Sequence, residues 1–571
     1  MHDAPLAPFT PRVPLAQLRL RRRVGRRIAR RSALVLAALA VAVVAARHAP
    51  AQIGPPPAPP ENPVTPAKAV LGKILFWDEQ LASDNTVSCG TCHRPAQGGG
   101  DLRFVANPGP DGIRPSPDDL FGSPGVIRSD AVNEYEPDPV HGFLPQATAR
   151  NAQTNLMAGF HHELFWDGRA ASTFVDPQTG LVAVASGGAL ESQSLAPIVS
   201  SVEMGHAGRD WSEVTTKLAL SHPLALAANL PADVAAALAV DPSYAELFDA
   251  AFGDPAITAA RIAFALASYQ RSFVPDQTAW DAFNAGNSAA LTPRQQNGLN
   301  LFTGKAGCGN CHVLGLFTDD TFRNIGLRDP ATDPGRQAVT GNFADRGKMK
   351  VPSLRNAGLR RRFMHSGQFV DLNQVVGFYD RGGDFADNRD PLIVPLRLTP
   401  GERDALVDFV ANGLTDGRAA QEVAPFDRPL LYAERNLGNP SLFGRGSRGA
   451  GGFEPRAIAV TPPNIGNWDF KFGLFEARGN SVALAILSLA AAPPGTLFKG
   501  IPINVDLSQI AYVGTFVTAG AGAGNGHATF VGELPDDPTL IGLELFAEWF
   551  VADPLARGGF ATSAGIEFDL F

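Results

Sequence analysis

The stretch VSCGTCHRP, residues 87 to 95, decides how this chain folds and what it carries. It places Cys89, Cys92 and His93 in the spacing C-x-x-C-H. In that motif the two thiols form thioether bonds to haem vinyl groups, and the histidine reaches the iron as an axial ligand. A redox-active C-x-x-C pair followed by an unrelated histidine would look the same, so one copy of the motif leaves both interpretations open.

A second copy resolves this ambiguity. In AGCGNCHVL, residues 306 to 314, Cys308 and Cys311 precede His312, and the chain has only four cysteines. An exported protein with an even number of cysteines would normally form disulfides, but here no cysteine is left over for one. The sequence therefore predicts two covalently bound haem c groups, with His93 and His312 as axial ligands.

The first 52 residues have the pattern of an export signal peptide. Residues 12 to 31 contain nine arginines and no acid, residues 32 to 46 are uninterruptedly apolar, and small residues surround position 50. This order is typical of a signal peptide and predicts a protein of the periplasm or cell surface. A retained membrane anchor is the alternative, although fifteen apolar residues are too few for a spanning helix.

The chain without this segment is strongly acidic. It has 38 basic and 55 acidic side chains, a formal charge of −17. Such a surface argues against binding to nucleic acid and favours a basic protein partner.

The patterning of the remaining chain changes twice. Residues 53 to 66 form a proline-rich linker. Helical periodicity follows at residues 67 to 85 and 257 to 273, after Leu291-Thr292-Pro293, and at residues 398 to 414, where Thr399 and Glu402 have the spacing of a capping box. Beyond about residue 426, stretches such as 503 to 520, 527 to 534 and 565 to 571 alternate apolar and polar residues, as strands do.

We therefore expect a mainly α protein. Two cytochrome c-type haem domains, at residues 67 to 285 and 286 to 425, are followed by an all-β, sandwich-like module at residues 426 to 571. The module contains no plausible catalytic group of residues, so an adhesive, sorting or stabilising role is expected for it.

Several ordered motifs between residues 66 and 418 resemble one family. They are the two haem sites and the stretches ARNAQTN, ELFWDGRA, APIVSSVEMG, VPSLRNAGL and FMHSGQFVDLNQVVGFYDRGG. Together they resemble the di-haem bacterial cytochrome c peroxidases, and among these the branch that contains MauG, the maturation enzyme of methylamine dehydrogenase. The resemblance implies that the N-terminal haem reacts with hydrogen peroxide. The C-terminal haem then relays electrons from a small cytochrome c or cupredoxin.

The resemblance also assigns roles to three residues near the first haem. Glu203, in Val-Glu-Met, matches the distal acid/base, and Pro197 matches a proline of the same pocket. Trp166 matches a tryptophan that lies between the haems and mediates electron transfer. The alternatives are a surface position for Glu203 and simple core packing for Trp166. An insertion at residues 175 to 189 is expected to reshape access to this pocket.

A calcium site is a further implication of the resemblance. Asn151 matches an asparagine near a calcium ion bound between the haem domains, and the backbone carbonyls around Arg360 and Arg362 match its other ligands. Three successive arginines are unfavourable around a cation, although a carbonyl ligand does not depend on its side chain.

The axial ligands on the far sides of the haems distinguish the branches of the family. Many relatives close the first haem with a histidine soon after C-x-x-C-H, but here no histidine follows His93 until His141. The first haem is therefore predicted to be open, with His141, His161 or His162 as alternative ligands that would have to approach from elsewhere in the chain.

At the second haem, Tyr379 stands where the MauG branch has a tyrosine ligand and other relatives have a methionine. Tyrosinate stabilises ferric and higher oxidation states of the iron. The alternative is a hydrogen-bonded structural tyrosine, with Met349 or Met364 as the ligand.

Three functions remain open from the sequence. The first is a peroxidase that reduces hydrogen peroxide with electrons from a donor protein. The second is a MauG-like oxidase that withdraws electrons from aromatic residues of a partner protein, and the third is an electron-transfer cytochrome without turnover. The donor, the substrate and the oligomeric state are not determined by the sequence.

Overall fold

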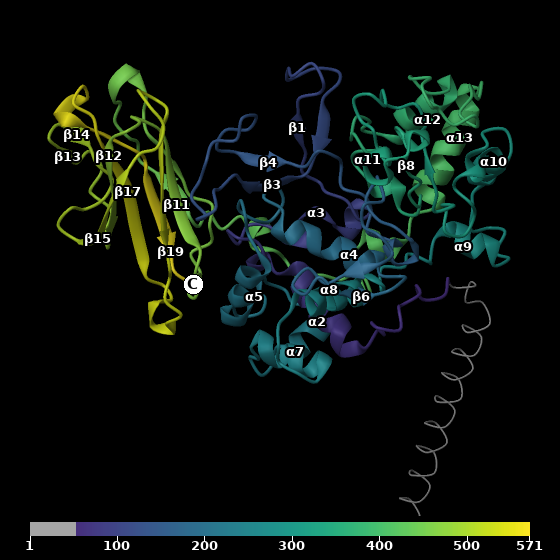
Figure 1. Cartoon of the computed structure of the whole chain (residues 1–571), viewed down its shortest axis with the longest axis horizontal. Coiled ribbons are helices and arrows are strands. Elements are labelled where there is room, and N and C mark those ends of the chain that lie inside the picture. Colours follow the sequence, from purple (N-terminus) through teal and green to yellow (C-terminus); the bar gives the residue numbers. More distant parts are fainter. Residues whose placement is uncertain (1–52) are drawn as a thin grey trace, which may run out of the picture.

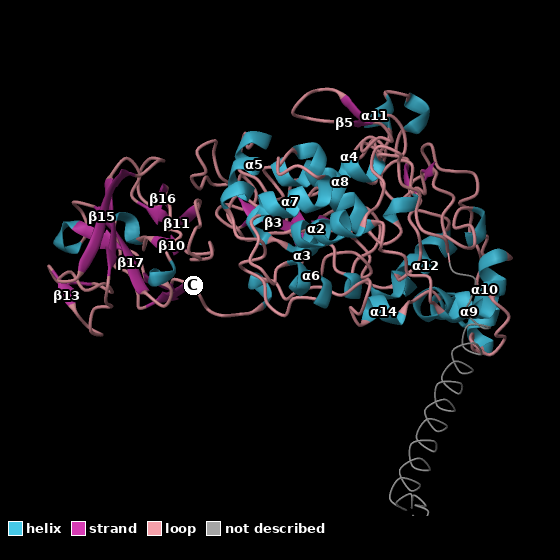
Figure 2. Ribbon diagram, turned by 90° about the horizontal axis from the view of Figure 1, so that it is seen from below, coloured by secondary structure: helices cyan, strands magenta, loops and turns pink. Residues whose placement is uncertain are grey.

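The computed structural model describes residues 53–571, so the predicted signal peptide lies outside the described part. Three parts follow one another along the longest axis of the molecule (Figures 1 and 2). The middle part consists of the helices α2 (Pro66–Trp77), α3 (Cys89–Cys92), α4 (Ala189–Leu195), α5 (Trp211–Leu220), α6 (Ala232–Ala237), α7 (Tyr244–Phe252) and α8 (Ala259–Gln270). One end consists of α9 (Ala279–Asn284), α10 (Pro293–Thr303), α11 (Gln337–Thr340), α12 (Leu372–Arg381) and α13 (Pro400–Asp408). The short helix α14 (Gly417–Ala420) packs on the middle part, where Ala419 joins the core.

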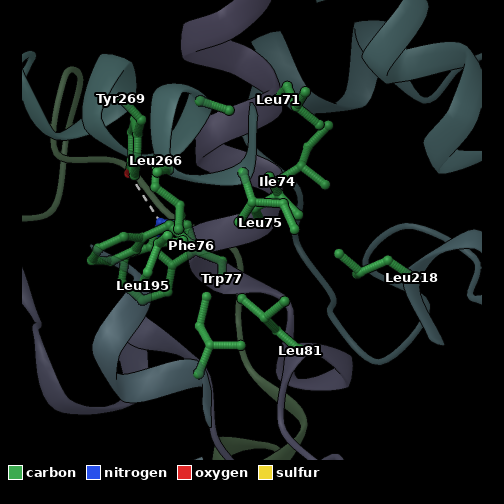
Figure 3. Packing of buried hydrophobic residues seen from close by; sticks show 14 of the residues in the cluster. Leu71, Ile74, Leu75, Phe76, Trp77, Leu81, Leu195, Leu218, Leu266 and Tyr269 are labelled. Carbon is green, nitrogen blue, oxygen red and sulfur yellow. Dashed lines mark hydrogen bonds between the residues drawn. The ribbon is translucent and has the colours of Figure 1, made fainter. Parts of the chain in front are cut away.

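The core of the middle part forms where α2 crosses α8. Thr65 caps α2 by accepting a hydrogen bond from Lys68 N, and Pro66 occupies the first turn, where its missing N–H is not needed. Figure 3 shows the apolar side chains of α2 packed against Leu266 of α8, with Trp77 Nε1 donating to the Tyr269 hydroxyl at 2.9 Å. Burial of these side chains, each worth about 1.5–3 kcal/mol, stabilises the crossing.

Both helical parts use a glycine to bring two helices together. At Gly72 of α2 an added Cβ would overlap the carbonyl oxygen of Ala265 in α8. At Gly298 of α10 it would overlap the carbonyl oxygen of Ala405 in α13. Each glycine lies on the helix that precedes a C-x-x-C-H motif. The two helical parts therefore share one packing scheme, and the second has its own apolar core around Phe302, Leu406 and Phe409.

The helices predicted from periodicity are confirmed, although the first is shorter than its periodic stretch. Within 67–85, α2 ends at Trp77 and a 3₁₀ turn, Glu79–Leu81, follows. The stretch 257–273 corresponds to α8, and the Thr292-Pro293 start to α10, which Thr292 caps. Thr399 and Glu402 form the predicted capping box of α13, which continues as a π-helical turn at Phe409–Gly413. Among the described residues, no helix is both long and apolar enough to cross a membrane.

Short strand pairs fill the loops around the helices. They are β1 (Val105–Asn107) with β2 (Leu120–Gly122), β3 (Pro124–Ile127) with β4 (Pro145–Ala147), β5 (Phe174–Val175) with β6 (Val182–Val184), and β7 (Phe322–Arg323) with β8 (Met349–Lys350). The first two pairs lie in the aperiodic stretch that follows the first haem motif, so this stretch has a defined path despite its composition.

The C-terminal part is sheet-rich, as predicted. One sheet has the order β10 (Arg456–Ile458), β11 (Phe470–Ala477), β16 (Gly526–Gly532). The other has the order β15 (Ile510–Val517), β12 (Val482–Ser488), β17 (Glu544–Ala552), β19 (Gly565–Asp569), β9 (Ser441–Phe443), and β18 (Phe560–Thr562) also pairs with β17. The C-terminal part also contains a separate small hairpin, β13 (Leu497–Phe498) with β14 (Ile501–Pro502).

A shared core joins these two sheets. Phe472 of β11 packs against Trp549 of β17, and the core around them contains residues from both sheets. The arrangement is that of a sandwich, with apolar inner faces packed on one another. The strands begin at Ser441, while Phe426 and Leu431 belong to the core of the middle helical part.

Buried lysines attach the sandwich to the middle part. Lys471 of β11 is almost fully buried and donates to Ser129 Oγ at 2.9 Å and Asn133 Oδ1 at 2.7 Å. Burial lowers the pKa of Lys471 to about 8. Lys217 of α5 forms an ion pair with Asp469 at 2.8 Å. These contacts favour a sandwich that stays docked on the middle part. Separating the two would leave several buried polar groups without their partners, which costs free energy.

The close approach at Gly72 gives a test of the packing scheme. We expect Gly72→Ala to lower the free energy of unfolding by about 1–3 kcal/mol, because the added methyl group forces α2 away from α8. Gly377 of α12, whose added Cβ would meet nothing within 4 Å, is the matched control. Gly377→Ala should stabilise the protein by up to about 1 kcal/mol through helix propensity. Denaturant unfolding followed by circular dichroism measures both, and equal effects would contradict the packing scheme.

Candidate haem sites

The first C-x-x-C-H motif is held in a defined local structure. Cys89 to Cys92 form the short helix α3, in which Ser88 N donates to Thr91 Oγ1 at 2.8 Å. His93 follows directly, and its Nδ1 is 3.1 Å from the carbonyl oxygen of Gly99. A carbonyl only accepts, so Nδ1 carries the proton and Nε2 has the free lone pair that an iron ligand requires.

The second motif repeats this geometry. Cys308 begins a 3₁₀ turn, Cys308–Asn310, and His312 Nδ1 is 3.1 Å from the carbonyl oxygen of Phe317. Burial lowers the pKa of both His93 and His312, so both rings are neutral, as metal ligands are. Each site therefore has two thiols and one oriented imidazole nitrogen.

A cavity of about 1080 Å³ lies beside His93. Its wall includes Glu203 and Pro197, the two residues expected there, together with Gln193 of α4. The sequence argument did not identify Gln193. Its position four residues before Pro197, one helical turn away, was the available signal.

Glu203 is partly buried in the wall of this cavity. Burial raises the pKa of its carboxyl group, while a hydrogen bond from Ser200 and the charge of Arg169 oppose that shift. A raised pKa makes a carboxyl group a better proton acceptor than an ordinary surface carboxylate. Glu203 therefore lies where the resemblance expects the acid/base group, and that role stays a prediction.

The first cavity offers no second iron ligand of the histidine or methionine type. Among the described residues that line it, His93 is the one histidine and there is no methionine. His141 is engaged elsewhere, with Asn107 Oδ1 at 2.9 Å, and both His161 and His162 bind Asp320. These contacts hold the three alternative histidines away from the cavity.

A smaller cavity, of about 200 Å³, lies beside Cys308, Cys311 and His312. Tyr379 of α12 lines it, and among the described residues no hydrogen-bond partner of the Tyr379 hydroxyl occurs. Burial raises the pKa of this phenol. Met349 and Met364 line the same cavity, so all three candidate ligands are brought to it.

Trp166 lies in the wall that the two cavities share. It lines the cavity of His93 and that of His312, as Thr154 does. Its indole Nε1 donates to the carbonyl oxygen of Asn151 at 2.8 Å, and its ring lies edge-on to His365, with centroids 6.2 Å apart. A fixed aromatic ring thus lies between the two sites. Trp166 lines both cavities, so it is more than a residue packed in the core.

The residues expected to bind calcium form hydrogen bonds with one another. Asn151 Nδ2 donates to the carbonyl oxygens of Arg362 at 3.2 Å and Met364 at 3.1 Å. Calcium takes about six to eight oxygen ligands, usually with carboxylates among them. The described residues contain no group of three or more His, Cys, Asp or Glu that could hold a metal ion. The Asn151 amide and these two carbonyls therefore meet through hydrogen bonds, and a calcium ion between them stays a prediction.

The inserted segment does not reach the first cavity. Phe174 at its edge packs on Phe264, and Gln178 accepts a hydrogen bond from Ala259 N. None of residues 175–189 lines the cavity beside His93. The expected effect on access is therefore wrong for the cavity wall, because the hairpin packs on α8 instead.

Fold and site together define a protein with two c-type haem-attachment motifs, one of them beside a cavity that the Glu203 carboxyl group lines. Comparison with known proteins agrees with this class. Residues 66–289 match the family model of the di-haem cytochrome c peroxidases. The cytochrome-c peroxidase IdrP1 of Pseudomonas sp. (strain SCT) is 30% identical over 442 residues, which cover 71% of this chain and 94% of that protein. The chain belongs to the di-haem cytochrome c peroxidase family and is an oxidoreductase of the cytochrome-c peroxidase type.

Other relatives include the MauG proteins. The methylamine utilization protein MauG of Methylorubrum extorquens is 31% identical over 362 residues, covering 62% of this chain and 80% of that protein. A crystal structure of a MauG-like protein associated with microbial copper homeostasis aligns with a TM-score of 0.47 and 26% identity, over 66% of this chain and 97% of that one. The family implies two c-type haems. Cys92 and His93 line one cavity, and Cys308, Cys311 and His312 line the other, so the residues present fit such haems.

Haem content tests this assignment. We expect the wild-type protein to keep two haems per chain after denaturation, measured as the pyridine haemochrome. Replacing Cys89 and Cys92 with alanine should leave one haem, and so should replacing Cys308 and Cys311. Unchanged haem content in either double variant would contradict covalent attachment at that motif.

Proposed function

We propose that this chain is a di-haem peroxidase that reduces hydrogen peroxide at the His93 site, with electrons relayed through the His312 site. The observation that carries the proposal is the cavity beside His93, which Glu203 lines and which no second histidine or methionine of the described residues lines. Such an open position suits a catalyst, because a pure electron carrier benefits from two closed irons. When bound, the haem iron supplies the redox chemistry of peroxide cleavage.

The roles of the chain's own residues follow from their positions. Glu203 would take up a proton from one oxygen of hydrogen peroxide and return it to the other, so that the second oxygen can leave as water. Pro197 and Gln193 line the same wall, where they restrict and orient the small substrate. Reduction of one peroxide to two waters consumes two electrons and two protons, and the electrons come from a small donor protein such as a cytochrome c or cupredoxin.

Trp166 is the proposed electron path between the two sites. Its Nε1–H donates to a carbonyl oxygen, which cannot take up the proton. The indole therefore stays protonated while charge passes, and its fixed ring avoids reorganisation on each transfer.

A MauG-like oxidase that acts on aromatic residues of a partner protein is the second candidate. Tyr379 favours it, since this phenol lines the second cavity with no hydrogen-bond partner for its hydroxyl in the described chain. We propose Tyr379 as the second axial ligand of the His312 haem. Such a ligand favours oxidised states that both haems could share.

The proposed organisation keeps the predicted order of domains. Residues 67 to 285 and 286 to 425 are the two proposed haem domains, supported by two cores and by the repeated glycine contact. The β module was predicted at residues 426 to 571, but Phe426 and Leu431 pack in the core of the middle part and the sandwich strands begin at Ser441, so its start lies later than predicted. We propose a stabilising or surface-attachment role for it. The signal-like N-terminus supports export to the periplasm or cell surface.

The acid/base role of Glu203 predicts a large kinetic effect. Glu203→Gln should lower kcat for peroxide reduction by about 10²–10⁴-fold, with the haem spectra retained. Because burial raises the pKa of Glu203, the base form is lost as pH falls through a value above the usual 4.5, and this acid limb should be absent in the variant. Glu136→Gln, at an exposed ion pair, is the control. Equal rates for wild type and Glu203→Gln would refute the role.

The ligand proposal is tested by three single variants. Tyr379→Phe should convert the low-spin ferric haem signal to a high-spin one, because the His312 iron then loses its second axial ligand. Met349→Leu and Met364→Leu should leave the spectrum unchanged. If instead a methionine variant alone alters the low-spin signal, that methionine is the ligand and Tyr379 is structural.

A further inference from the structure

Arg360 projects a positive charge into the junction between the two haem sites. Its Nη2 donates to the carbonyl oxygen of Ala152 at 2.6 Å, and its Nη1 is 3.5 Å from the carbonyl oxygen of Gly98. The side chain lines the cavity of His312. Gly98 belongs to the loop that also holds His93, through Gly99. One guanidinium thus contacts the support of the first site and the wall of the second.

No carboxylate among the described residues pairs with Arg360. The chain compensates other inward-facing guanidinium groups: Arg355 pairs with Asp281 at 2.7 Å, and Arg323, in the same cavity wall, pairs with Asp319 and Asp390 at 2.9 Å each. Burial alone lowers the pKa of Arg360, to about 10. A charge in such a position is costly unless an anion compensates it.

The Arg360 side chain packs closely against two glycines, Gly98 and Gly100, of the loop after the first motif. An added Cβ at Gly98 would lie 2.9 Å from Arg360 Cγ, and one at Gly100 would lie 2.7 Å from Arg360 Nη1. A side chain at either position would crowd Arg360, and at Gly98 it would also meet the backbone carbonyl oxygen of Asn356, 2.6 Å away. The two glycines therefore leave room for the guanidinium beside this loop.

We propose that Arg360 supplies an internal cation for haem propionate carboxylates at this junction, in the place where a divalent metal ion was expected. The proposal rests on the proposed occupancy of both sites by haem. Haem is the one anionic group that the family implies here, and a guanidinium matches a carboxylate in geometry and charge. The same positive charge opposes a calcium ion near Asn151, whose amide already serves the carbonyls of Arg362 and Met364.

Electrostatics gives the expected consequence. A fixed cation beside a propionate cancels negative charge near the iron, and it does so strongly where water is excluded. Removing it leaves an uncompensated carboxylate that stabilises ferric over ferrous iron. The midpoint potential of the haem at the His312 site should therefore fall.

Optical redox titration of the haem-loaded protein tests this. In Arg360→Leu we expect the ferric-to-ferrous ratio of the His312 haem to rise at least tenfold at a given potential, which is about 59 mV for a one-electron couple. Arg360→Lys should restore most of the shift, whereas Arg361→Leu, at the exposed neighbouring position, should match wild type. A two-haem Arg360→Leu protein with wild-type potentials overturns the proposal, while a wild-type chain without two haems overturns the proposed function as well.

Metal analysis gives the second measurement. The wild-type protein, loaded with haem and dialysed against a chelator, should contain no stoichiometric calcium and should keep its haem spectra and potentials. Calcium at one ion per chain, with spectra that change when it is removed, would show that a metal ion holds the junction and would overturn the assignment of Arg360.

Discussion

The junction between the two haem sites depends on the hydrogen bonds of one buried residue, Asn151. Its backbone N–H donates to the carbonyl oxygen of His365 at 2.8 Å, its side-chain amide bridges the carbonyls of Arg362 and Met364, and its own carbonyl accepts from Trp166. These contacts join a segment of the middle helical part to a segment more than 200 residues later. They fix the indole that both cavities share, so the distance and orientation between the sites are set by backbone groups that substitution hardly changes.

The two sites share their attachment chemistry and differ in what surrounds it. Both histidines are oriented by a hydrogen bond from Nδ1 to a backbone carbonyl. The first site adds a larger cavity and the carboxyl group of Glu203, whose pKa is raised by burial, and these suit the proton transfer proposed there. The second adds a smaller cavity with a phenol and two thioethers, which suits a site that stores and passes charge. The same C-x-x-C-H motif can therefore support peroxide reduction at one site and electron transfer at the other, as proposed, because the residues that line the two cavities differ.

Features encoded by local spacing could be predicted from the sequence. The two C-x-x-C-H motifs, the capped helix starts at Thr292 and Thr399, and the alternating strands near the C-terminus depend on neighbouring residues. Trp166, Pro197 and Glu203 were found through a family resemblance, and the structure brings all three to the cavity of His93.

Features that depend on contacts between distant segments could not be predicted. Lys471 looks like an ordinary strand residue, and only the fold shows that it is buried against Ser129 and Asn133, about 340 residues earlier. The insertion at residues 175–189 has no local signal that tells where it packs. From the sequence, Arg360 was only an unfavourable positive charge near a predicted calcium site. The contacts of its guanidinium with the carbonyl oxygens of Ala152 and Gly98 could be found only from the structure.

We propose that the two irons differ in coordination, one open and one closed. Electron paramagnetic resonance of the ferric, haem-loaded protein measures this most directly. We expect one high-spin signal from the His93 haem and one low-spin signal from the His312 haem. Two low-spin signals would contradict it, because they would mean that a further ligand closes the first site and that the cavity beside Glu203 is not free for peroxide.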